Sequence, residues 1–128
     1  MAVLLDTHIV IAFLRNSFRT QFPQVHRLLE GSAADGYVSV ASLWEIAIKH
    51  RLGKLDIDVP LERIPDSLTA SGLTILPIEI AHVLTAADPE PPTRDPFDRL
   101  LLAQCQVEGL QLVTIDRALV EHPLAFRF

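Results

Sequence analysis

The sequence predicts an α/β fold, a three-layer α/β/α sandwich in which helices cover both faces of a central parallel sheet. Two observations predict this class. Apolar runs of strand length alternate with segments whose apolar residues recur at helical spacing. Acidic residues also follow the apolar runs where helices begin, as in doubly wound folds. Strands and helices that alternate in this way are joined by right-handed crossovers, which makes the sheet parallel.

The first half of the chain contains two predicted strands, each followed by a helix. Residues 2–6 (AVLLD) predict a buried strand, and residues 7–14 predict an apolar helix directly after it. A helix over 24–31 ends at its glycine, and a short strand follows around 37–40. The apolar residues of 42–54 recur at helical spacing and predict the next helix.

The second half repeats the alternation. Residues 60–71 predict a weaker helix that Pro65 breaks or shortens. A strand over 73–78 and a helix over 79–87 come next, and a rigid, proline-rich loop then leads to a helix over 97–108.

The last predicted elements are a strand over 110–115 and a short helix from Asp116. The chain has 128 residues, of which 49% are hydrophobic, and this is enough aliphatic material for one core. We therefore expect a single domain over residues 1–128.

Cysteine usage and the N-terminal segment bear on location. Cys105 is the only cysteine, which excludes an internal disulfide and favours a reducing compartment, so we expect a cytoplasmic protein. The apolar N-terminal segment contains Asp6 and His8, lacks a preceding basic stretch and is too short to span a bilayer. We expect no membrane association.

The net charge of −5 provides no bulk attraction for nucleic acid. It does not exclude such a substrate, because a divalent cation bound by carboxylates inverts their local field. A few suitably positioned basic side chains are then sufficient to contact the substrate phosphates. The candidate substrate-binding residues are Lys49, Arg94 and Arg99. A purely solubilising role on helix surfaces is at least as common for any one of them.

Each acidic residue at a helix start has a structural interpretation. Asp6 and Asp116 follow strands and precede helices, where aspartate is a good N-cap. Ser42 and Glu45 have the spacing of a capping box, which would put Glu45 in the first turn of its helix.

The acids near residue 97 have a similar pattern. Asp95 is the expected N-cap because a proline follows it, and Asp98 is then the candidate ligand in the first turn. Capping explains each acid separately. If the helix starts share one sheet edge, however, their carboxylates would repel each other unless a divalent cation neutralised them, which predicts a hard-metal site.

Other reactive side chains argue against different chemistries. No two of the five histidines have the spacing of a pair of metal ligands. We expect the His8 side chain to be exposed or to have its ring nitrogens hydrogen-bonded. Cys105 lies within a leucine-rich helix, which predicts a packed thiol rather than a nucleophile. Trp44 and Phe97 are able to stack on a base, but their apolar neighbours recur at helical spacing, so we predict that both lie in the core.

Four segments taken together resemble a known family. They are LLDTH at 4–8, SLWEIAIK at 42–49, RDPFDRLLLAQ at 94–104 and LVTIDRAL at 112–119. In order and spacing they resemble the PIN-domain ribonucleases, specifically the VapC-type toxins of bacterial toxin–antitoxin pairs. A departure is Thr93, which stands where relatives often show histidine.

The resemblance implies a fold, a metal and an activity. It implies a PIN-like sandwich and an endoribonuclease that hydrolyses RNA phosphodiesters with water activated by Mg²⁺, or alternatively by Mn²⁺. The catalytic and metal-binding residues that the resemblance implies are Asp6, Glu45, Asp98 and Asp116. Its supporting residues are Thr7, Ser42, Asp95 and Thr114.

The resemblance also implies two partners, an RNA substrate and a cognate VapB-type antitoxin. The apolar helices and stretches such as IVIAFL favour a homodimer. Two other function classes remain open from the residues alone. A phospho-acceptor receiver domain shares the size and the acidic Mg²⁺ pocket, but this chain lacks its paired acids after the first strand and its mid-chain acceptor aspartate. A non-catalytic α/β binding module would use the acids only as caps.

Overall fold

The protein is built around a four-stranded, fully parallel sheet with strand order β3-β2-β1-β4. The computed structural model describes residues 1–31 and 33–128. The strands are β1 (Ala2–Leu5), β2 (Asp35–Ser39), β3 (Thr74–Leu76) and β4 (Gln111–Val113). The helices are α1 (Thr7–Leu14), α2 (Phe18–Gln21), α3 (Pro23–Glu30), α4 (Val40–Arg51), η1 (Leu61–Arg63), α5 (Ile64–Ala70), α6 (Ile80–Leu84) and α7 (Pro96–Glu108).

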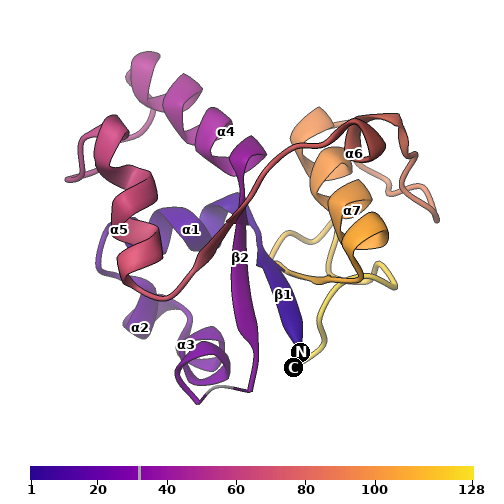
Figure 1. The fold of residues 1–128 in the computed structure, drawn as a ribbon, viewed down its shortest axis with the longest axis horizontal. Helices are drawn as coiled ribbons and strands as arrows, with labels where there is room; N and C mark the ends of the chain where they lie inside the picture. The colour runs from indigo at the N-terminus through magenta and orange to yellow at the C-terminus, as the bar shows by residue number, and fades with distance from the viewer. Residues whose placement is uncertain (32) are drawn as a thin grey trace.

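Helices cover both faces of the sheet, as predicted. Figure 1 shows α1, α2, α3 and α5 on one side of β1 and β2, and α6 and α7 on the other. The alternation of side chains along β1 explains the two layers, because Val3 and Leu5 belong to one apolar cluster and Leu4 to the other. All three are fully buried, which explains why this strand is apolar at successive positions. The α/β/α class predicted from the sequence is confirmed.

Several element boundaries differ from the prediction at helix starts. The helix predicted from residue 42 begins at Val40, because Ser39 is its N-cap and accepts a hydrogen bond from the Ala41 N–H at 3.0 Å. The capping box predicted for Ser42 and Glu45 is therefore wrong, and Glu45 lies in the second turn of α4. The short helix α2 was not predicted at all.

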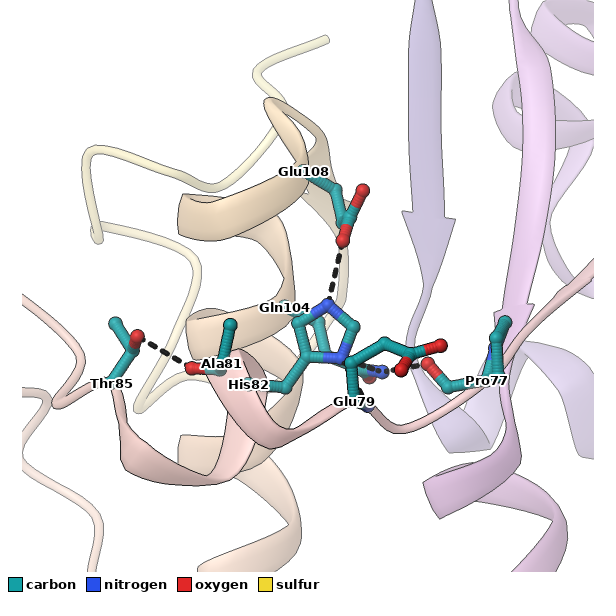
Figure 2. Close-up of polar contacts among 7 residues, drawn as sticks. All are labelled: Pro77, Glu79, Ala81, His82, Thr85, Gln104 and Glu108. Atoms are coloured by element: carbon teal, nitrogen blue, oxygen red, sulfur yellow. Dashed lines mark hydrogen bonds and ion pairs between the residues drawn. The ribbon is translucent and has the colours of Figure 1, made fainter.

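The helix predicted over 79–87 is shorter than expected. α6 ends at Leu84 because the Thr85 hydroxyl donates to the Ala81 carbonyl at 2.6 Å and the Thr85 backbone is extended. Buried His82 holds the short helix in place (Figure 2): its Nδ1 accepts from the Glu79 N–H at 2.9 Å, and its Nε2 donates to Glu108 on α7 at 2.7 Å. This contact fixes α6 against α7.

Gln104 extends the same polar cluster. Its amide nitrogen donates to the Pro77 carbonyl at 3.2 Å, between β3 and α6. Among the residues described, its Oε1 is the buried side-chain oxygen that has no hydrogen-bond partner.

The short helix predicted from Asp116 is replaced by turns. The chain returns toward the sheet, where the Leu112 N–H donates to the Leu124 carbonyl and the Phe126 N–H donates to the Leu112 carbonyl, each at 2.8 Å. No helix in the described part of the chain has the length and apolar character needed to cross a bilayer.

Candidate metal centre

Asp6 lies at the carboxyl end of β1, where the strand order reverses. β2 and β3 lie on one side of β1 and β4 on the other, so the crevice of this doubly wound sheet opens between the ends of β1 and β4. The Asp6 N–H donates to the Val113 carbonyl of β4 at 2.9 Å across that point. The fold therefore places Asp6 where such sheets bind ligands.

Both carboxylate oxygens of Asp6 accept hydrogen bonds. Oδ1 accepts from the Thr7 N–H at 2.7 Å and caps α1, and Oδ2 accepts from the Thr114 hydroxyl at 2.6 Å. Asp6 is only 3% exposed. Burial raises the pKa of Asp6 above its usual value, although the hydrogen bonds from Thr114 and Thr7 act in the opposite direction.

The Thr114 hydroxyl connects Asp6 to Asp116. Besides donating to Asp6, it accepts from the Asp116 N–H at 3.0 Å. Asp116 is half-buried, and its Oδ1 accepts from the Ala118 N–H at 2.9 Å, which stabilises the turn after β4. The two aspartates that follow β1 and β4 are thus held together by one hydroxyl group.

A second buried hydroxyl contact joins α1 to α4. The Oγ1 atom of Thr7 and the Oγ atom of Ser42 lie 2.9 Å apart, and both residues are almost fully buried. Ser42 lies on α4 three residues before Glu45, so this contact fixes the helix that carries the third acid beside Asp6.

Glu45 is paired with a lysine on its own helix. Its Oε2 lies 2.9 Å from the Lys49 Nζ, one turn later, and its side chain is 13% exposed. Lys49, a candidate substrate-binding residue, is therefore already neutralised by Glu45.

Asp98 lies in the first turn of α7, and Asp95 is the N-cap, as predicted. The Asp95 side chain accepts from the Phe97 N–H at 2.9 Å. The Thr93 hydroxyl accepts from the Asp95 N–H at 3.1 Å and donates to Asp98 Oδ2 at 3.4 Å. Thr93 was noted in the sequence only as a departure from the family pattern, and its contact with Asp98 is a site feature that sequence reasoning missed.

The candidate cations of this region have different surroundings. The Arg99 guanidinium donates to the Thr93 carbonyl and to the Glu90 carboxylate, each at 3.0 Å, so it holds the loop before α7. Arg94 is exposed.

The charges of the other acids act on Asp98. Burial, followed by the neighbouring negative charges, raises the pKa of Asp98 to about 7 from a usual value of 3.8. These charges belong, in order of effect, to Asp95, Asp6, Asp116 and Glu45. The four acids predicted from the sequence are therefore close enough to interact at one edge of the sheet.

The acids are gathered but do not form a closed coordination shell. Within residues 1–31 and 33–128, no three His, Cys, Asp or Glu side chains lie close enough to hold a metal ion as they stand. Like charges keep carboxylates apart until a cation neutralises them. The donor set nevertheless fits a hard divalent cation, because all four side chains offer carboxylate oxygens.

Three hollows of the surface lie away from the four acids. Two of them, of about 310 and 610 Å³, share Phe13, Phe18 and His26 near α1, α2 and α3. A third, of about 470 Å³, is lined by α6 and α7. None of these three is lined by Asp6, Glu45, Asp98 or Asp116.

Two predictions about other side chains had different outcomes. Cys105 is a packed thiol, as predicted, and burial raises its pKa to about 12. The prediction that Trp44 lies in the core is wrong, because it is 58% exposed, whereas Phe97 is partly buried against the second apolar cluster. The prediction failed because apolar residues lie on more than one face of α4, so helical spacing alone does not identify the buried face.

Comparison with known proteins agrees with this geometry. A model of the PIN domain family matches residues 3–123. A search of curated proteins finds no match. Among solved structures, the chain is similar to one in a toxin–antitoxin complex from Klebsiella pneumoniae, with a TM-score of 0.63, 18% identity and coverage of 98% of this chain and 96% of that one. It is also similar to a chain of VapBC2 from Rickettsia felis bound to a promoter DNA fragment, with a TM-score of 0.60, 15% identity and the same coverages.

Proposed function

Because the chain belongs to the PIN domain family, which its match over residues 3–123 shows, we propose that it is a metal-dependent endoribonuclease toxin of a VapBC-type toxin–antitoxin system. The observation that carries the proposal is the placement of Asp6 and Asp116 at the crevice between β1 and β4, where the Thr114 hydroxyl contacts both residues. Burial, followed by the charges of Asp95, Asp6, Asp116 and Glu45, raises the pKa of Asp98 to about 7, which supports the gathering of the acids. The proposal treats residues 1–128 as a single PIN domain.

Asp6, Glu45, Asp98 and Asp116 would hold the cation, with Mg²⁺ as the expected ion and Mn²⁺ as the alternative. When bound, the cation supplies Lewis-acid charge to the scissile phosphate. Asp6 is oriented for this role by the Thr7 N–H and the Thr114 hydroxyl, so it does not have to reorganise when the substrate arrives.

Asp98 is the best candidate for handling the proton of the attacking water. Asp98 lies half-buried in the first turn of α7 beside the other acids, whereas both carboxylate oxygens of Asp6 already accept hydrogen bonds. In the proposed step, an Asp98 carboxylate oxygen accepts the proton while the water oxygen bonds to phosphorus and the bond to the 3′ oxygen breaks. The products carry a 5′-phosphate and, after the 3′ oxygen takes a proton from solvent, a 3′-hydroxyl.

Two protein partners are proposed with this activity, an antitoxin and a second copy of the chain. The similar chains from Klebsiella and Rickettsia belong to toxin–antitoxin assemblies, which supports a small VapB-type antitoxin for this chain as well. Homodimer formation is supported by α6, which exposes the large apolar residues Ile80, Val83 and Leu84. We place the protein in the cytoplasm without membrane association.

Digestion of RNA tests the proposed activity. The purified protein is expected to cleave RNA in Mg²⁺ and to lose this activity in EDTA. Asp6→Asn should abolish cleavage while the far-ultraviolet circular dichroism spectrum stays native, because asparagine keeps a capping oxygen but removes the charge. Full cleavage by the Asp6→Asn protein would count against the proposal, and phosphorylation by acetyl phosphate without cleavage would favour a receiver domain.

A further inference from the structure

Trp44 and Phe97 form an aromatic pair between the two helices that carry Glu45 and Asp98. Their ring centroids are 5.5 Å apart and their planes are inclined at 67°, which is an edge-to-face arrangement. Trp44 directly precedes Glu45 on α4, and Phe97 directly precedes Asp98 on α7. The pair is therefore attached to two of the four acids of the proposed site.

The indole ring of Trp44 is largely uncovered. Trp44 is 58% exposed, whereas Phe97 is partly buried against the second apolar cluster. Phe97 is thus anchored in the core and supports Trp44 through the edge-to-face contact. A large flat ring that is held by one aromatic contact and is mostly exposed offers a preorganised surface to another flat group.

The charge of the site favours an uncharged contact at this position. The chain has a net charge of −5, and its acids meet where the substrate phosphate would lie. Two of the three candidate cations are already paired, Lys49 with Glu45 and Arg99 with Glu90. Stacking of a base on an aromatic ring adds affinity without requiring a positive charge.

We propose that Trp44, supported by Phe97, is the stacking platform for an unpaired RNA base next to the phosphodiester that is cleaved. Bases inside a double helix are covered by their neighbours, so the platform selects single-stranded segments or loops. This inference rests on the proposed ribonuclease function and adds a substrate class and a residue to it. Trp44 touches a base and no reacting atom, so it is a positioning residue.

Intrinsic fluorescence tests the contact directly, because Trp44 is the only tryptophan of the chain. The unsubstituted full chain is titrated in Mg²⁺ with single-stranded oligoadenylate whose phosphorothioate linkages resist cleavage, and with an abasic oligonucleotide of the same linkage, length and charge. Oligoadenylate is expected to quench the emission to saturation, and the abasic strand is not. Equal quenching by both strands, or none by oligoadenylate, overturns the proposal.

Kinetics on an otherwise unchanged chain provide a second readout. Trp44→Leu keeps an apolar side chain but removes the aromatic face, and it should raise KM for single-stranded RNA on the order of tenfold with little change in kcat. Trp44→Phe should restore most of the lost affinity. Leu52→Ala is the matched control, since Leu52 is 63% exposed at the other end of the same helix, and its KM should stay unchanged.

The outcomes separate this proposal from the proposed function. An unchanged KM in Trp44→Leu, with metal-dependent cleavage intact, overturns the stacking role alone. Absence of any cleavage contradicts the ribonuclease function, while the fluorescence titration still decides the stacking. If the emission of Trp44 depends on protein concentration without RNA, and Trp44→Leu dissociates a dimer in sedimentation, the ring is covered by a second copy and the proposal is overturned.

Discussion

Asp6 supports the helix and the site with the same carboxylate. Oδ1 caps α1 through the Thr7 N–H, and Oδ2 accepts from the Thr114 hydroxyl. The two roles considered for this residue in the sequence are therefore compatible. The resemblance placed Thr114 among the supporting residues, but residue spacing alone did not show its contact with Asp6, because the two positions are 108 residues apart.

Thr114 is expected to matter through its hydroxyl group. Thr114→Val keeps the shape of the side chain but leaves Asp6 Oδ2 without its donor, so the free energy of unfolding should fall by about 1–3 kcal/mol at neutral pH. Cleavage should fall as well, because Asp6 loses its orientation. Urea denaturation and the RNA digestion measure the two effects. Thr114→Ser retains the hydroxyl and is the control, and equal stability of the valine and serine variants would contradict the role of this hydrogen bond.

Asp98 should make the metal-free protein less stable as the pH rises. Its folded pKa, about 7, lies above the unfolded value of 3.8, so between these pH values the folded state holds a proton that the unfolded chain has lost. Stability contributed by this proton is complete below the unfolded pKa and is lost as the pH rises through about 7. Above that pH the contribution of Asp98 is constant.

Thermal unfolding in EDTA across this pH window checks the effect. The Tm of the wild-type protein should fall more between about pH 4 and pH 7 than that of Asp98→Asn, which cannot titrate at this position. Asp6, whose pKa is also raised, is present in both proteins, so it contributes equally to both pH profiles. The difference between the profiles therefore belongs to Asp98. Identical pH profiles for the two proteins would contradict a raised pKa of Asp98 in the folded state.

At the scale of elements, the start of α4 shows why local pattern was insufficient. Ser39 and Ser42 are both suitable caps, and Glu45 made Ser42 the better match to a capping box. The choice depends on partners that are distant in sequence, because Thr7 engages the Ser42 hydroxyl and β2 delivers Ser39 in an extended conformation. The helix was predictable, and its first residue was not.

Ser39→Ala tests the corrected cap. Removing the oxygen that accepts from the Ala41 N–H should lower the free energy of unfolding by about 1 kcal/mol in urea denaturation. Ser39→Asp, which keeps a capping oxygen, is the control and should retain more of the stability than alanine. If Ser39→Ala is as stable as the wild type, the helix does not begin where the structure places it.

The C-terminal elements differ from the prediction for a related reason. The shortened α6 depends on the Thr85 hydroxyl and on the contact of His82 with Glu108, and the missing last helix depends on pairing between residues near 112 and 125. Helical spacing describes one element at a time, so it cannot detect a competing partner from another element.

At the scale of the whole molecule, the sheet order brings the acids together. The sequence predicted the α/β class from alternation, but the order β3-β2-β1-β4 is a tertiary property that local pattern does not contain. This order makes β1 and β4 neighbours at the crevice, where Asp6 directly follows β1 and Asp116 comes three residues after the end of β4. The contact of Thr7 with Ser42 and the packing of α4 against α7 then bring Glu45 and Asp98 to the same edge.

The central claim is that Asp6, Glu45, Asp98 and Asp116 bind one divalent site. Anomalous X-ray diffraction from a crystal of the full chain soaked in Mn²⁺ tests it most directly. We predict an anomalous peak among these four carboxylates, at distances suited to hard-metal coordination, and its loss in a crystal of Asp6→Asn. A Mn²⁺ peak at a site that none of these side chains reaches, or well-ordered carboxylates that stay apart at saturating Mn²⁺, would contradict the account.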